Sequence, residues 1–444
     1  MPSFSRLAGL LLILTSALNL IWPKLHSVAL RNSLLAVLLL TGLWLYRRLA
    51  RGGLPLRQLR LPVWLYLLLS GWLLATVTLA DDPLNSLTQY RGEWLMGAVA
   101  LAIGLLLATL ARSGRLTGLT PQALIIAITL GLALPVLGLI GLNLLDVFAG
   151  QPLALGEAPG YGRTSLSYSH NILFGFLLAD AVARCSGKPR LLPLPAAALL
   201  AALALSLFAT YLLNTRNGTL CVLLMILLAV GLIVWQQRQR IRPAWLLGAL
   251  LLAGALTAFI RLAYQADQRW ATFRESTQLA LDTQTHRAWL YPDMPRPLMR
   301  NGQPVDESAY MRLAWFKEGA LAILDYPLGV GFGRNAYGHA MQRKYGIKGG
   351  HSHSSLIDFT LSGGIPGILL WLALSAALIR LGWQAFIQRS DSAGIVLSLF
   401  VAGTLLRMLI DSNLRDHGLE QTLFLYALLA TLALPARPTP PSPT

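Results

Sequence analysis

Residues 351–367 read HSHSSLIDFTLSGGIPG, and here a long polar segment gives way to an apolar run that begins at Gly364. The run over 364–383 has the length of about twenty residues that a helix needs to cross a bilayer. His353 stands just ahead of this boundary, and its imidazole can gain or lose a proton near neutral pH. The stretch therefore predicts a membrane protein whose chemistry takes place beside the membrane.

The composition of the chain also indicates a membrane protein. Hydrophobic residues make up 55% of the 444 positions and charged residues 12%, a mixture too apolar for a water-soluble surface. We expect an all-α, polytopic integral membrane protein with about twelve transmembrane helices, because that many apolar runs approach the spanning length. These runs lie at 6–22, 27–46, 62–80, 94–111, 122–145, 170–184, 191–213, 217–235, 243–262, 364–383, 393–411 and 419–434.

The expected layout of the chain follows from these runs. Residues 1–263 hold nine transmembrane helices, 264–363 form one long, partly helical loop, and 364–434 hold three more transmembrane helices. The last stretch, 435–444, is expected to be a disordered tail.

Positive charge alternates between the loops that join the runs. Arginines such as Arg47 and Arg48 follow the second run, whereas Asp81 and Asp82 follow the third. Since short loops rich in arginine and lysine stay on the cytoplasmic side, we expect both termini in the cytoplasm and the long loop on the opposite face. This alternation explains the net charge of +17 without nucleic acid, because the basic residues form short hinges and no stripe with interleaved aromatics.

One helix of the long loop has a clear beginning and end. Asp306 and Glu307 put acidic groups at its start, apolar residues follow at helical spacing, and Pro327 ends it. The alternate glycines of 329–333 that come next do not fit a dinucleotide fingerprint, because no strand precedes them and their spacing differs. We interpret them as a turn that lets backbone approach a ligand.

A second helix of the loop is expected over 265–290. It would lie along the membrane surface, with Trp270 and Trp289 as interfacial anchors.

Arginines near the outward ends of the runs indicate a function. Arg163, Arg216 and Arg312 occupy such places, although outward loops usually carry little positive charge. Guanidinium groups suit phosphate and diphosphate oxygens, while lipid headgroups or local ion pairs are the alternative explanation. Together with an outward histidine that takes a proton from a hydroxyl, these arginines favour a reaction on a lipid diphosphate.

A metal site is the competing interpretation of the histidines. His339, His351 and His353 offer nitrogen ligands, but a His-x-His pair is only half a site and no carboxylate or cysteine completes a known pattern. Cys185 and Cys221 lie on separate elements and indicate no disulfide. We therefore expect neither a metal nor a cofactor.

Four motifs resemble the O-antigen ligase family, which belongs to a wider group with O-antigen polymerases and protein O-oligosaccharyltransferases. His353-Ser354, nine residues and Gly364-x-x-Gly367 resemble the ligase signature. Arg312-Leu313-Ala314-Trp315, running on to Pro327-Leu328-Gly329-Val330-Gly331, resembles the family's loop helix and turn. Thr215-Arg216-Asn217-Gly218 resembles its arginine turn, with Thr where Ser is usual, and Arg163 ahead of His170-Asn171 resembles a looser position.

The resemblance implies a metal-independent, inverting glycosyltransferase of lipopolysaccharide biosynthesis. It would transfer a glycan from undecaprenyl diphosphate to a sugar hydroxyl of lipid A-core oligosaccharide, at the periplasmic face of the bacterial inner membrane. Its partners would be these two substrates and membrane lipids. His353 would be the catalytic base, with Arg216 and Arg312 beside it, and Arg163, Arg216 and Arg312 would bind the diphosphate.

The same resemblance suggests roles for further charged residues, which are weaker candidates for the site. The core phosphates of the acceptor would contact Arg334, Arg343 and Lys348. Asp411 would orient an imidazole or form an ion pair with Arg415.

Other functions compete with the ligase reading. A polymerase would use a similar donor, and an oligosaccharyltransferase would glycosylate a protein serine or threonine. A lipid or sugar transporter, from another class, would need charged residues deep within its spans and broken helices in paired halves. Asp180 and Arg407 are among the few such charges, and the sequence shows no internal repeat.

Overall fold

The computed structural model describes residues 2–49, 53–237, 272–291, 293–347, 349–415 and 417–435, with isolated positions between 254 and 265. Within these residues every regular element is a helix, which confirms the all-α fold. The helix bundle contains α1 (Pro2–Ile21), α2 (Val28–Leu49), α3 (Arg60–Thr76), α5 (Met96–Ser113), α6 (Pro121–Phe148), α7 (Arg163–Cys185), α8 (Ala196–Leu213), α9 (Arg216–Gln237), α14 (Ser355–Arg389), α15 (Ser392–Ile410) and α16 (His417–Leu432).

Eight helices among the described residues are long and apolar enough to cross a membrane. They are Val28–Leu49, Arg60–Leu79, Pro83–Ser113, Pro121–Phe148, Ala196–Leu213, Arg216–Gln237, Ser355–Arg389 and Ser392–Ile410. The third of these joins the short α4 (Pro83–Gln89) to α5 through a π-helical turn. A multi-pass membrane protein is thus confirmed, while the count of twelve spans stays a prediction. The run expected at 243–262 and the tail beyond Pro435 lie outside the described residues.

Glycines allow the central helices to approach closely, as is common between membrane helices. A Cβ on Gly104 of α5 would lie 2.3 Å from the carbonyl oxygen of Phe424 in α16. In the same way a Cβ on Gly382 of α14 would lie 2.4 Å from the carbonyl oxygen of Gly394 in α15. The apolar α16 is enclosed by these helices, and its residues are almost all buried.

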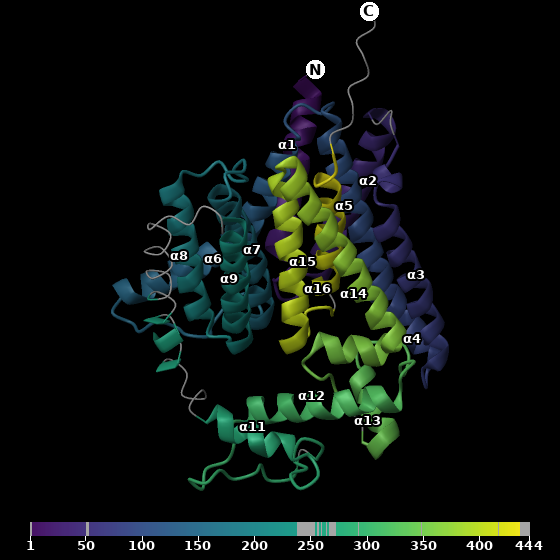
Figure 1. Ribbon diagram of the computed structural model, residues 1–444, viewed down its shortest axis with the longest axis vertical. Coiled ribbons are helices and arrows are strands. Elements are labelled where there is room, and N and C mark those ends of the chain that lie inside the picture. Colours follow the sequence, from purple (N-terminus) through teal and green to yellow (C-terminus); the bar gives the residue numbers. More distant parts are fainter. Residues whose placement is uncertain are drawn as a thin grey trace, which may run out of the picture.

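The long loop folds at one end of the bundle. Figure 1 shows α11 (Phe273–Leu281), α12 (Glu307–Asp325) and α13 (Ala336–Tyr345) together at this end, with the start of α1 at the other. The predicted loop helix is confirmed as α12: the Asp306 side chain caps its start by accepting the N–H of Ala309, and it ends at Asp325. Of the helix expected over 265–290, residues 266–271 lie outside the described residues, α11 is helical, and 282–290 are not helical. The sequence did not predict α13.

The loop has a core of its own, which corrects the expected role of Trp289. This side chain is only 5% exposed and packs edge-on against Tyr345, with ring centroids 5.7 Å apart. Its indole N–H donates to the carbonyl of Thr283. Trp289 is therefore a core residue of the loop and not a membrane anchor, while Trp270 lies outside the described residues.

The helix predicted from Gly364 begins nine residues earlier, at Ser355. Gly364 instead marks a break within α14, with φ 67° and ψ −179°, a conformation open essentially to glycine alone. A Cβ there would lie 2.4 Å from the backbone of Leu328, and the N–H of Val330 donates to the carbonyl of Leu361. The turn over 329–333 thus approaches the backbone of α14, and its approach to a ligand stays a prediction.

Candidate active site

The turn that carries His353 is fixed by the end of α15. His353 has a left-handed backbone, with φ 59°, and Ser354 after it caps α14. The Ser354 hydroxyl donates to the carbonyl of Met408 at 3.1 Å, and the N–H of Ser355 donates to the carbonyl of Asp411 at 2.9 Å. These bonds hold the imidazole at a defined place between the bundle and the loop.

The loop helix supplies the other wall of the site. The His353 ring stacks on Trp315 of α12, with centroids 5.3 Å apart and planes 12° from parallel. An open cavity of about 540 Å³ lies beside this pair. It is lined by Arg296, Pro304, Val305, Asp306, Glu307, Ser308, Met311, Arg312, Trp315 and His353. Two of the three predicted catalytic residues, His353 and Arg312, therefore face one cavity.

The environment of His353 keeps its imidazole neutral. Burial, and next the charge of Arg312, lower the pKa of His353 to about 4, although Asp411 opposes the shift. Burial lowers the pKa of His351 to about 3, with the charge of Arg415 adding to the effect. The two rings lie 4.1 Å apart. At neutral pH both imidazoles can accept a proton.

The predicted diphosphate ligands share one electrostatic neighbourhood. Burial lowers the pKa of the Arg312 guanidinium; the charges of Arg216 and Arg163 act in the same direction, while Asp411 and Asp306 oppose them. Arg312 donates no hydrogen bond to any residue that the structure describes. Arg216 forms an ion pair of 2.9 Å with Asp306, a partner that sequence reasoning did not identify.

Two of the residues expected at the acceptor join the loop to the bundle instead of facing this cavity. Arg334 lies 2.6 Å from Glu93, and Arg343 lies 2.8 Å from Asp81. Arg343 also donates to the carbonyl of Leu79. These ion pairs explain both arginines as structural ties, and their contact with acceptor phosphates stays a prediction. The third, Lys348, lies outside the described residues.

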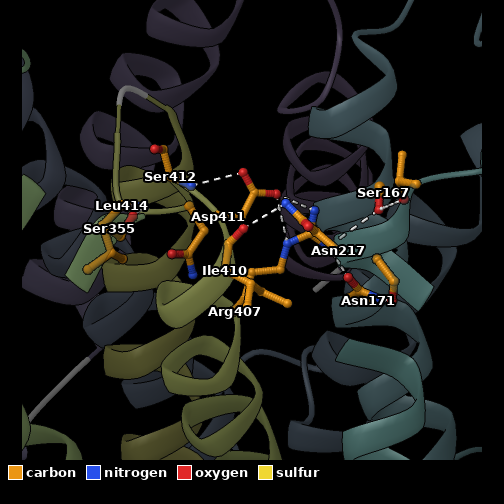
Figure 2. Close-up of polar contacts among 12 residues, drawn as sticks. Ser167, Asn171, Asn217, Ser355, Arg407, Ile410, Asp411, Ser412 and Leu414 are labelled. Carbon is orange, nitrogen blue, oxygen red and sulfur yellow. Dashed lines mark hydrogen bonds and ion pairs between the residues drawn. The ribbon is translucent and has the colours of Figure 1, made fainter. Parts of the chain in front are cut away.

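A buried arginine, Arg407, lies beside Asp411 near the end of α15 (Figure 2). Arg407 of α15 forms an ion pair of 2.7 Å with Asp411 and also donates to Ser167 and Asn171 of α7. Asp411 is thus paired with Arg407, whereas the predicted alternative partner, Arg415, contacts Asn335 at 3.5 Å. The sequence signal was available, because a charged residue inside a membrane helix needs a partner.

The described residues contain no group of three or more histidine, cysteine or carboxylate side chains that could hold a metal ion. His351 and His353 form a pair only, and His339 lies 4.0 Å from Asp81, away from them. Metal independence remains a prediction.

Fold and site together define a multi-pass membrane protein with a neutral imidazole and a group of arginines collected at one end of its helices. Residues 201–372 match the family model described as O-antigen ligase. Over this segment, which is less than half of its length, the chain is similar to O-antigen ligases. The matched segment holds Arg216, Arg312 and His353 but not Arg163. No curated protein matches the chain.

Proposed function

We propose that this protein is an O-antigen ligase of lipopolysaccharide biosynthesis. It transfers a glycan from undecaprenyl diphosphate to a sugar hydroxyl of lipid A-core oligosaccharide, at the periplasmic face of the inner membrane. One observation carries the proposal: Arg312, without a hydrogen-bond partner among the described residues, lines the same cavity as the neutral imidazole of His353. A cation and a base at one cavity are what transfer from a diphosphate to a hydroxyl requires.

The reaction assigns one role to each group. The imidazole of His353 accepts the proton of the acceptor hydroxyl, and the oxygen attacks the anomeric carbon of the glycan. The bond between that carbon and the diphosphate oxygen breaks, and undecaprenyl diphosphate leaves with the electron pair. Arg312, Arg216 and Arg163 neutralise the charge that grows on the leaving group. Attack opposite the leaving group inverts the anomeric configuration.

The arginines take the part that a divalent metal plays in many other diphosphate reactions. Guanidinium forks bind phosphate oxygens through two parallel N–H groups, so they can neutralise the diphosphate without an ion. We therefore propose a metal-independent reaction.

The proposed orientation draws support from the two ends of the bundle. The site lies at the loop end, and at the other end the carbonyls of Leu432, which ends α16, and of Ala433 and Leu434 just beyond it accept hydrogen bonds from Arg112 and Arg389. Arginines at that end agree with a cytoplasmic face.

The test is a transfer assay with the purified protein, a lipid-linked glycan, lipid A-core and EDTA. Glycan attached to lipid A-core is the expected product. Elongation of the lipid-linked glycan would instead identify a polymerase, and modification of an added acceptor protein an oligosaccharyltransferase. Absence of any covalent product, with transport of the lipid-linked glycan across vesicles, would identify a transporter. Loss of transfer in EDTA that one added ion restores would contradict metal independence.

A further inference from the structure

The ion pair between Arg216 and Asp306 joins the two parts of the site. Arg216 opens α9 in the bundle, and Asp306 caps α12 in the loop. Arg216 Nη2 lies 2.9 Å from Asp306 Oδ1, and the two side chains are only 12% and 11% exposed. The same Oδ1 accepts the backbone N–H of Ala309 at 2.7 Å. One carboxylate oxygen therefore serves both the helix cap and the guanidinium.

The second N–H₂ group of Arg216, Nη1, has no acceptor among the described residues. Arg216 Nη1 is buried, and it donates no hydrogen bond to any of the residues that the structure describes. A buried donor without an acceptor is unfavourable, and a guanidinium that binds phosphate uses two parallel N–H groups. One N–H₂ group of Arg216 thus binds a carboxylate, and the other has no acceptor among the described residues.

The charged residues near the cavity indicate which kind of ligand Arg216 Nη1 is suited to bind. Asp306 lines the same cavity as Arg312 and His353. The charges of Arg216 and Arg163 lower the pKa of the Arg312 guanidinium, as burial does, and the carboxylates of Asp411 and Asp306 raise it. Asp411 is already paired with Arg407, so Asp306 is the carboxylate that offsets Arg216 near Arg312. Displacement of Asp306 from Arg216 would leave this guanidinium suited to an anionic ligand.

On the basis of the proposed function, we propose that Asp306 competes with the donor diphosphate for Arg216 and so sets the donor affinity. When the donor binds, both prongs of Arg216 turn to diphosphate oxygens, while Asp306 keeps its cap bond to Ala309. When the glycan has been transferred, the return of Asp306 to Arg216 favours release of undecaprenyl diphosphate. The carboxylate thus weakens binding of donor and lipid product alike.

The experiment is the Asp306→Asn variant of the full-length protein in the transfer assay. Asparagine caps a helix about as well as aspartate, so the substitution removes the charge and keeps the cap. The KM for the lipid-linked donor and the inhibition constant of undecaprenyl diphosphate should both fall about three- to fivefold, the upper end of what single ion pairs at protein surfaces contribute. The KM for lipid A-core should stay the same.

Asp325→Asn is the matched control. Asp325 ends the same helix, pairs with Lys344 at 2.7 Å and lies at the opposite end from Arg216. The variant loses the same charge, and its donor KM should equal that of the wild type. If Asp306→Asn does not fold, Asp306→Ser replaces it, because serine also caps the helix without a charge.

Arg216→Gln separates failure of this inference from failure of the proposed function. If Arg216→Gln leaves the donor KM unchanged, Arg216 does not bind the donor and its proposed role is wrong. If Arg216→Gln raises the donor KM but Asp306→Asn leaves it unchanged or also raises it, Asp306 does not compete. Asp306 is then only a structural tie between loop and bundle.

Discussion

Arg407 lies in α15, whose end holds the His353 turn, and Arg312 lines the cavity beside His353. The two arginines differ in the partners that their charges have. Arg407 is 1% exposed and binds Asp411, Ser167 and Asn171 inside the bundle. Arg312 is partly buried beside the cavity and donates no hydrogen bond among the described residues. A buried charge is tolerated when it is paired and hydrogen-bonded. The comparison therefore separates an arginine paired within the bundle from one that, under the proposed function, binds the donor diphosphate.

Removal of His353 has the largest expected effect, because His353 is the proposed catalytic base. His353→Ala should lower the rate of transfer about 10²- to 10⁴-fold, the usual contribution of a general base. The His351→Ala variant is the control and should retain much more activity, since His351 does not line the cavity. Transfer is measured with equal amounts of folded protein. Near wild-type transfer by His353→Ala would mean that this histidine is structural.

Loss of Arg407 should destabilise the protein. Arg407→Leu leaves the carboxylate of Asp411 buried without its partner, which typically costs about 3–5 kcal/mol. The measurement is thermal unfolding in detergent. The Arg407→Leu/Asp411→Asn double variant should recover part of the loss, because no unpaired charge remains. An unchanged unfolding temperature for Arg407→Leu would show that the ion pair is not needed for the fold.

Exchange of Arg312 for lysine tests the other side of the comparison. Lysine keeps the charge but loses the two-pronged contact with diphosphate oxygens, so Arg312→Lys should lower kcat/KM for the donor about tenfold. Arg184→Lys is the control, because Arg184 pairs with Asp180 at the far end of α7 and should tolerate lysine. Equal kcat/KM values for Arg312→Lys and Arg184→Lys would mean that Arg312 does not bind the donor.

The pH profile gives the smallest and most specific effect. Only the neutral imidazole can accept a proton, and burial together with Arg312 lowers the pKa of His353 to about 4. The acid limb of kcat/KM should therefore lie near pH 4, and activity should be constant from about pH 5 to 7. Recovery of activity on return to neutral pH excludes irreversible unfolding. An acid limb near the ordinary histidine value of about 6.5 would contradict a buried base.

Local sequence patterns located most of the helices correctly. The runs 27–46 and 393–411 correspond to Val28–Leu49 and Ser392–Ile410, and the acidic start of the loop helix fixed its first turn. Hydropathy is a property of neighbouring residues, so such boundaries can be predicted from the sequence. The start of α14 could not, because Asp358, Thr360 and Ser362 make Ser355–Gly363 look like a polar loop. The loop core buries this segment through Ile357 and Leu361.

The residue types at the site were also a property of the sequence: an imidazole at a membrane boundary, arginines at outward helix ends and the motifs of the O-antigen ligase family. Their partners were not. Arg334 meets Glu93 from 241 positions away, and Arg407 meets Asn171 from 236. Only the packing of α7, α15 and the loop decides which cations are neutralised by carboxylates, because ion pairing depends on distance in space. The sequence thus determined which chemical groups are present, and the tertiary structure decided which of them pair with one another.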